Sequence, residues 1–319
     1  MNASPSSPLP VILDVDTGID DALALLLAAT HPSLEVKAVT CAAGNVSLAQ
    51  VVDNTLGVLA VAGRDDIPVA AGAEGPLVGR PRDASHVHGA NGLADITLPA
   101  HGAAPVDAHA VELLRRTLDE AADPMTIIAL APMTNIALLL RMYPAVRAKI
   151  ARIVFMGGAI GTGNVTAVAE FNVWHDPEAA EVVLDSGVPT LMYGLEPFYA
   201  ATCDTTAIRA LASSARPAAQ LAGGLLDHLT AGRGEEGRVR AGEAPLGDAG
   251  TVCAVIDPGA LTVVTAPVGV ALAPGETRGQ TIVDMRHAAP GAPGTHASTG
   301  VVTAVDTTRY RELFVGALS

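Results

Sequence analysis

Residues 11–27 read VILDVDTGIDDALALLL, and this stretch decides the fold. Its first three residues form an apolar run that is typical of a short buried strand. Residues 22–29 are apolar at every position, which favours a helix that is covered on most sides. Thr17-Gly18 make the bend between them, since glycine supplies the backbone freedom of a tight turn. The stretch therefore predicts the opening strand and helix of an α/β sheet.

Acidic side chains gather at this bend. Asp14 and Asp16 lie two apart, on one face of the strand's carboxyl end, and Asp20 and Asp21 fall in the first turn of the helix. Capping the helix needs one carboxylate, so the others require another explanation. Like charges this close raise one another's pKa values unless a cation lies among them, and an all-oxygen set suits calcium or magnesium. The sequence predicts a metal site here.

An alternative starts from the same residues. Residues 14–17 also fit the DxDxT start of phosphotransferases of the haloacid dehalogenase type, in which the first Asp is the nucleophile. Those enzymes need a lysine further along the chain. The two lysines of this chain, Lys37 and Lys149, lie in no recognisable context, which makes this phosphatase the weaker alternative.

The composition limits the class of protein. With 319 residues, 50% hydrophobic and 16% charged, we expect one domain over residues 10–319 behind a flexible Ser/Pro-rich tail at residues 1–9. A formal net charge of -14 opposes binding to nucleic acid or to an anionic membrane. No apolar run reaches the roughly 20 residues of a membrane span, and no secretion signal is recognisable. Three widely spaced cysteines indicate reduced thiols and a cytoplasmic protein.

Apolar runs and polar turns alternate along the chain, which predicts an open, mostly parallel Rossmann-like sheet flanked by helices, with an antiparallel C-terminal portion. Helices are expected to begin at Asn135, capped by that residue, and at Pro177, capped by Asp176. Further strands are predicted at 35–41, 67–70, 125–130, 152–156, 188–192, 261–264, 268–272, 280–284 and 300–305, and helices at 47–61, 107–121, 205–211, 218–230 and from Asp248, with a hairpin tip at 288–294.

Ligands of open α/β sheets bind beyond the carboxyl ends of the strands. Asp16, Asn45, Leu130 and residues 158–172 should therefore share one crevice. A Gly/Pro/His-rich loop at residues 72–102 is long enough to be functional. We expect Trp174, the single tryptophan, to pack in the core, residues 194–204 to form a turn, and the glycine-rich residues 232–247 to be mobile.

Seven motifs together resemble the nucleoside hydrolases, also called inosine-uridine preferring nucleoside N-ribohydrolases. They follow the family's order over most of the chain. The motifs are DVDTGIDDALAL from Asp14, AAGN from Ala42, VHGANGL from Val87, APMTNIALLL from Ala131, FMGGAIGTGN from Phe155, AEFNVWHDPEAA from Ala169 and APLGD from Ala244.

This resemblance implies calcium-dependent hydrolysis of the N-glycosidic bond of ribonucleosides to ribose and a free purine or pyrimidine base. Calcium's flexible oxygen shell accommodates a sugar diol and a water, whose pKa a bound cation lowers. Asp16 would be the general base, and the transition state would resemble an oxocarbenium ion. The implied calcium ligands are the carboxylates of Asp16, Asp21 and Asp248 and the main-chain carbonyl of Leu130.

The resemblance also implies the substrate contacts. Carboxylates and amides suit a polyhydroxylated ring and would reject a deoxyribose by leaving polar groups unpaired. The implied sugar contacts are Asp20, Asn45, Asn164, Glu170, Asn172 and Asp248, with Met156 and His88 around the sugar and base.

One departure concerns the leaving base. Many inosine-uridine members carry a His immediately before the last metal Asp, where this chain has Gly247. The candidates to assist the base in its place are His88, Tyr199, His228 and Arg233, the last two assigned to the mobile segment. The preferred base stays open. The resemblance to this family also implies an oligomer, and we expect a homodimer or homotetramer. A non-catalytic, calcium-dependent ribonucleoside or sugar-binding protein is the alternative from another class.

Overall fold

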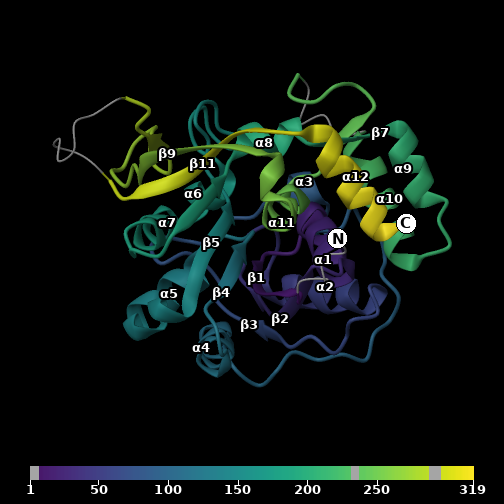
Figure 1. Ribbon diagram of the computed structural model, residues 1–319, viewed down its shortest axis with the longest axis horizontal. Helices are drawn as coiled ribbons and strands as arrows, with labels where there is room; N and C mark the ends of the chain where they lie inside the picture. Colours follow the sequence, from purple (N-terminus) through teal and green to yellow (C-terminus); the bar gives the residue numbers. More distant parts are fainter. Residues whose placement is uncertain (1–6, 231–236, 287–295) are drawn as a thin grey trace, which may run out of the picture.

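The computed structural model describes residues 7–230, 237–286 and 296–319. Its centre is a nine-stranded sheet in the order β10-β9-β11-β6-β5-β4-β1-β2-β3 (Figure 1). The strands from β6 to β3 pair in parallel, as do β11 and β6, whereas β9 pairs antiparallel with β11 and β10. The predicted fold class is therefore confirmed. The strands are β1 (Leu9–Val15), β2 (Leu34–Cys41), β3 (Val69–Ala71), β4 (Met125–Ala129), β5 (Ile150–Met156), β6 (Thr190–Tyr193), β9 (Leu261–Val270), β10 (Thr281–Val283) and β11 (Ser298–Val305).

Helices cover both faces of the sheet (Figure 1). Separate clusters of buried apolar side chains lie on the two faces, one around α1, α2, α10 and α11, the other around α4, α5 and α7. The helices are α1 (Ile19–Thr30), α2 (Leu48–Val61), α3 (Ser85–His88), α4 (Ala110–Glu120), α5 (Thr134–Met142), α6 (Phe171–His175), α7 (Pro177–Leu184), α8 (Leu195–Ala200), α9 (Thr205–Ala212), α10 (Pro217–Thr230), α11 (Asp248–Ile256) and α12 (Thr307–Leu318).

The opening unit forms as its sequence predicts. β1 lies between β2 and β4 in the middle of the sheet, which explains why its residues from Val11 to Val15 are all buried. Helix α1 packs against α2, α10, α11 and α12, and its residues from Asp21 to Ala29 are buried. Because elements from both halves of the chain cover this helix, its apolar residues need no polar face.

Several boundaries differ from the expectations. β1 begins at Leu9, within the predicted tail. The strands expected at 261–264 and 268–272 are one strand, β9, because the chain pairs with β11 up to Pro267 and with β10 from Val268 onward. Helix α8 replaces the turn expected at residues 194–204, and the long loop contains the short helix α3. The hairpin tip expected at 288–294 lies outside the described residues.

Two segments were missed altogether. The C-terminal helix α12 was not anticipated from its sequence, and a small antiparallel sheet joins β7 (Thr202–Asp204) to β8 (Glu243–Pro245). Short 3₁₀ turns, at Pro144–Lys149 and Pro258–Ala260, precede β5 and β9. The three cysteines are free and buried, and within the described ranges no helix is long and apolar enough to cross a membrane.

The helix caps give one confirmation and one correction. Asp176 caps α7 as predicted, with its Oδ1 accepting a hydrogen bond from the Ala179 amide at 3.0 Å. Asn135 does not cap α5, because the helix begins one residue earlier at Thr134 and the N-cap position is Met133. The side chain of Asn135 turns towards the ends of β1 and β2 instead.

Replacing Leu26 by alanine should lower the free energy of unfolding by about 2–5 kcal/mol, because the side chain is fully buried on α1 and its loss leaves a cavity. Urea denaturation followed by circular dichroism measures this change. Val263→Ala is the control, since Val263 is 44% exposed on β9 and should change stability by less than about 0.5 kcal/mol. Equal losses in the two variants would contradict the packing of α1.

Candidate active site

A cavity of about 520 Å³ opens beyond the carboxyl ends of the parallel strands. Its lining comes from the segments after β1, β2, β4 and β5, from helices α3, α6 and α8, and from the start of α11. The four segments expected to share one crevice therefore meet. The predicted site residues in the lining are Asp16, Asp20, Asn45, His88, Leu130, Met156, Asn164, Glu170, Asn172, Tyr199 and Asp248, and Gly247 lines the cavity with them.

The carboxylate of Asp21, in the first turn of α1, stabilises the turn between β1 and α1. Asp21 accepts hydrogen bonds from the main-chain amides of Asp16 at 3.2 Å and Gly18 at 3.0 Å, and so caps α1. Asn45, from the segment after β2, donates its side-chain amide to Asp21 at 3.1 Å and its main-chain amide to Asp16 Oδ2 at 2.8 Å. A Cβ on Gly44 would lie 2.0 Å from Asp16 Oδ2, so this contact requires glycine there.

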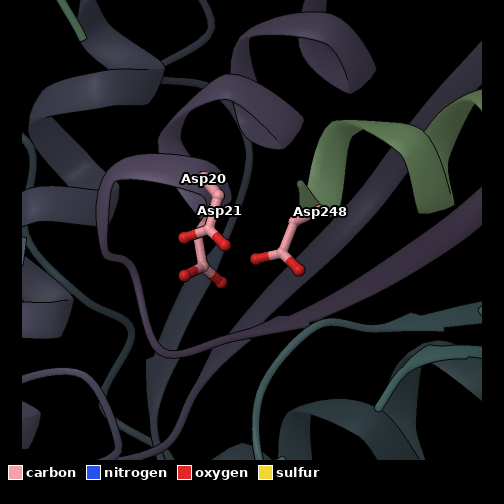
Figure 2. A group of neighbouring side chains, drawn as sticks. All are labelled: Asp20, Asp21 and Asp248. Carbon is pink, nitrogen blue, oxygen red and sulfur yellow. The ribbon is translucent and has the colours of Figure 1, made fainter. Parts of the chain in front are cut away.

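Three carboxylates converge from two helix N-termini. Asp20 and Asp21 project from the first turn of α1 towards Asp248, the first residue of α11 (Figure 2). One oxygen from each lies within 4.8 Å of the others. Oδ1 of Asp20 and Oδ1 of Asp248 are buried and have no hydrogen-bond partner among the described residues. Unpaired anionic oxygens this close together fit a hard divalent cation, the ligand class predicted for this turn.

The observed trio differs in part from the ligand set that the resemblance implies. Asp21 and Asp248 belong to both sets, whereas Asp20 takes the place of Asp16. The carbonyl oxygen of Leu130 accepts a hydrogen bond from Asn172 Nδ2 at 2.6 Å. Asp16 and the Leu130 carbonyl therefore stay predictions as metal ligands.

The pKa values of the four aspartates indicate that their negative charges lack a counter-charge among the described residues. Burial raises the pKa of Asp21 to about 7, and the adjacent Asp20 adds to the increase. Burial likewise raises the pKa of Asp20 to about 6. The pKa values of Asp16 and Asp248 lie well above their usual range, through burial first and then through the neighbouring aspartates. A cation among these groups would stabilise their ionised forms.

His88 is held as a neutral imidazole. Its Nδ1 accepts a hydrogen bond from the main-chain amide of Ile19 at 3.1 Å, so the ring proton resides on Nε2. Burial lowers the pKa of His88 to about 4. The residue therefore lines the cavity with its Nε2–H as a hydrogen-bond donor, and its assistance to the leaving base stays a prediction.

The buried side chain of Glu170 organises the opposite wall. Its carboxylate caps α6 by accepting the amides of Asn172 at 2.8 Å and Val173 at 3.1 Å. It also accepts the Gly158 amide at 2.9 Å, which ties the loop after β5 to α6. Burial raises the pKa of Glu170 to about 7. Asn164 closes the same loop by accepting the Phe171 amide at 2.9 Å.

The remaining wall is aromatic, and sequence reasoning missed most of it. Trp174 lines the cavity with the Arg82 guanidinium 3.8 Å from its ring centre, so its assignment to the core is wrong. Phe198 and Tyr199 of α8 line the cavity in an edge-to-face pair. The signal that could have found α8 is Gly194 followed by an apolar and aromatic run, which suits a short helix.

Gly247 lies where this aromatic wall meets the acidic group. Its φ of 56° is in the left-handed region, and a Cβ there would lie 2.7 Å from Asp20 Cβ and 3.2 Å from Phe198 Cε2. Of the other leaving-group candidates, His228 is exposed near the end of α10, not in a mobile loop, and does not line the cavity. Arg233 lies outside the described residues.

Comparisons with known proteins agree with this geometry. The sequence model of the family described as inosine-uridine preferring nucleoside hydrolase matches residues 11–312. The pyrimidine-specific ribonucleoside hydrolase RihA of Salmonella agona (strain SL483) is 44% identical over 276 residues, which cover 86% of this chain and 88% of that protein. The chain belongs to the nucleoside hydrolase family.

Solved structures of nucleoside hydrolases share the fold. A plant nucleoside hydrolase, PpNRh1, matches with a TM-score of 0.88 and 31% identity over 98% of this chain and 99% of that one. An inosine-guanosine nucleoside hydrolase matches with a TM-score of 0.88 and 29% identity over 97% and 98% of the two chains. The protein is thus an enzyme of the class that hydrolyses N-glycosyl bonds of ribonucleosides, and the phosphatase alternative is wrong.

The cation-free protein should become more stable as the pH falls from about 8 to about 5, because the folded state binds protons there that the unfolded state does not. The folded pKa values of Asp21 and Glu170, about 7, exceed their unfolded values of 3.8 and 4.5. Stability therefore rises as the pH falls through the folded values. Thermal unfolding in a chelating buffer measures the trend.

Saturating calcium is the control for this pH series. A bound cation keeps the carboxylates ionised, so the increase in melting temperature towards low pH should shrink or disappear. If the melting temperature of the cation-free protein instead decreases steadily as the pH falls from about 8 to about 5, the raised pKa values are contradicted.

Proposed function

We propose that this protein is a calcium-dependent ribonucleoside hydrolase that releases ribose and a free base. The observation that carries the proposal is the convergence of oxygens from Asp20, Asp21 and Asp248, of which Asp20 and Asp248 line a cavity large enough for a nucleoside. Oxygen ligands of this kind suit calcium, which accepts six to eight of them in flexible geometry. When bound, the ion would anchor the vicinal hydroxyls of ribose and lower the pKa of a nearby water.

Asp16 is the proposed general base. It is buried at the carboxyl end of β1 and lines the cavity, and the Asn45 amide holds its Oδ2 in place. Among the described residues Oδ1 of Asp16 accepts no hydrogen bond, so it is available to take the proton of the attacking water.

The acidic surroundings also favour the proposed transition state. Cleavage of the N-glycosidic bond leaves positive charge on the ribose ring, and fixed carboxylates stabilise that charge as it develops. Asn45, Glu170 and Asn172 line the cavity around this group with acceptors and amides. We propose that they hold the sugar hydroxyls, so that a deoxyribose would leave buried polar groups unpaired.

We further propose a preference for pyrimidine ribonucleosides. The 44%-identical RihA protein is named pyrimidine-specific, whereas the inosine-guanosine hydrolase is 29% identical. Around the base, Val87, Leu229 and Pro245 line the cavity with the aromatic pair of α8. We expect the enzyme to act in the cytoplasm as a homodimer or homotetramer on free nucleosides, since its net charge of -14 disfavours polyanions.

Asp16→Ala should reduce ribose release by roughly 10²- to 10⁴-fold, the contribution typical of a positioned general base. The measurement is a reducing-sugar assay with calcium over a panel of purine and pyrimidine ribonucleosides, which also reports the preferred base. Asp65→Ala is the matched control, because Asp65 is exposed in the turn before β3. Calcium-dependent ribonucleoside binding without ribose release by the wild type would favour the non-catalytic alternative.

Assistance to the leaving base is assigned to Tyr199 ahead of His228 and Arg233, because Tyr199 lines the cavity beside Phe198. Tyr199→Phe should slow hydrolysis of uridine and inosine by about 10²-fold or more and change little with a p-nitrophenyl riboside, whose leaving group needs no proton. His228→Ala tests the second candidate, and Tyr143→Phe, outside the cavity, is the control. Equal losses on all three substrates would exclude leaving-group assistance.

A further inference from the structure

The side chain of Asn135 joins the ends of three neighbouring strands. It is fully buried on α5, just after β4. Its Nδ2 donates to Oδ1 of Asp14 at 2.9 Å, on β1, and to the carbonyl of Cys41 at 3.0 Å, on β2. Its Oδ1 accepts the main-chain amide of Ala73 at 2.9 Å, just after β3. Both hydrogens and the oxygen of the amide are therefore used.

Only a side-chain amide can make all three of these hydrogen bonds. A carboxylate at position 135 could not donate to Asp14 or to Cys41, and it would place a second negative charge against Asp14. An apolar side chain would remove all three hydrogen bonds in the interior, and Oδ1 of Asp14 would keep only the one that it accepts from the Thr40 hydroxyl at 2.6 Å. Gly72 gives an independent sign of tight fit, because a Cβ there would lie 2.2 Å from Asn135 Oδ1.

The strands that Asn135 joins carry the groups assigned to catalysis. Asp14 lies on β1, two residues before Asp16, which follows the end of that strand, and the Asp14 carbonyl accepts the amide of Leu130 at 2.8 Å. Cys41 ends β2, four residues before Asn45. The 2.8 Å contact between the Asn45 amide and Asp16 Oδ2 spans the gap between these two strand ends. Its length therefore depends on how far apart the ends are held.

We propose that Asn135 is a positioning residue of the active site. By fixing the ends of β1, β2 and β3 against the segment after β4, it sets the orientation of Asp16 and Asn45 towards calcium and ribose. It does so from outside the cavity, since it is not part of the lining. This inference rests on the proposed calcium-dependent function. Residues that hydrogen-bond to and orient the metal ligands typically contribute about 10- to 100-fold to metal affinity or activity.

Two variants test the inference by different routes. Asn135→Ala removes the amide, and Gly72→Ala keeps it but displaces it, because the new Cβ overlaps Asn135 Oδ1. Both should weaken calcium binding measured by calorimetry, and lower kcat/KM for ribose release, by about 10- to 100-fold. Thr190→Val is the matched control, since it removes a buried 2.9 Å hydrogen bond to Thr299 between β6 and β11. It should leave both quantities within about twofold of wild type.

A paired substitution separates positioning from simple destabilisation. Asn135→Asp alone sets two carboxylates against each other, whereas Asn135→Asp combined with Asp14→Asn restores one amide–carboxylate hydrogen bond. The double variant should recover part of the calcium affinity and of kcat/KM, with the Cys41 carbonyl still unpaired. Recovery of the melting temperature without recovery of calcium affinity would overturn the inference.

The remaining outcomes are equally decisive. If Asn135→Ala does not fold, Gly72→Ala and the paired substitution provide the same comparison. Calcium affinity and kcat/KM within twofold of wild type in folded Asn135→Ala or Gly72→Ala would overturn the positioning role while leaving the hydrolase intact. A wild type that binds calcium but releases no ribose would instead refute the proposed function, and the calorimetric comparison of the variants would still decide the role of Asn135.

Discussion

Mutual repulsion among buried carboxylates is the constraint on which the active site depends. Asp16, Asp21 and Asp248 are buried within one small region, and the partly exposed Asp20 completes the group. Removing these groups from water without a counter-charge is costly, which is why burial raises their pKa values. Such an arrangement is sustained where ligand binding supplies the missing positive charge, so the same feature that weakens the cation-free protein creates its metal affinity.

The fold concentrates this charge by bringing two helix N-termini to one point. α1 follows the central strand β1 after a short turn, and α11 arrives from the far end of the chain to pack against α1. The positive ends of both helix dipoles therefore face the acidic group and offset part of its repulsion. Gly247 makes this approach possible, because a Cβ there would overlap Asp20, and Gly44 likewise lets the segment after β2 approach Asp16. The site thus depends on the close approach of these backbone segments as much as on its charged side chains.

Sequence reasoning captured the parts of this site that are local. The spacing of the aspartates around Thr17-Gly18 sufficed to place Asp20 and Asp21 together in the first turn of α1, whereas Asp248 was implied only by the resemblance and Asp14 is hydrogen-bonded to Asn135 instead. The antiparallel C-terminal portion was also predicted, from the succession of short apolar segments after residue 260. The sequence could not show which of several possible partners a polar side chain contacts in the folded protein. Asn135 follows a strand at a helix start, where capping is the common role, yet tertiary contacts with β1 and β2 hold its amide.

Trp174 and Gly247 illustrate the same limit on the base side of the cavity. A single tryptophan in an apolar setting favours the core, but the loop carrying Arg82 places a guanidinium over its ring and keeps it at the cavity wall. At Gly247 the missing histidine is visible in the sequence, whereas its structural consequence is not. Phe198 lies so close that a side chain at this position would displace it or Asp20. Gly247 therefore leaves the cavity wall apolar beside Phe198, and the neighbouring Tyr199 of the same helix is the polar group nearest in sequence to that wall.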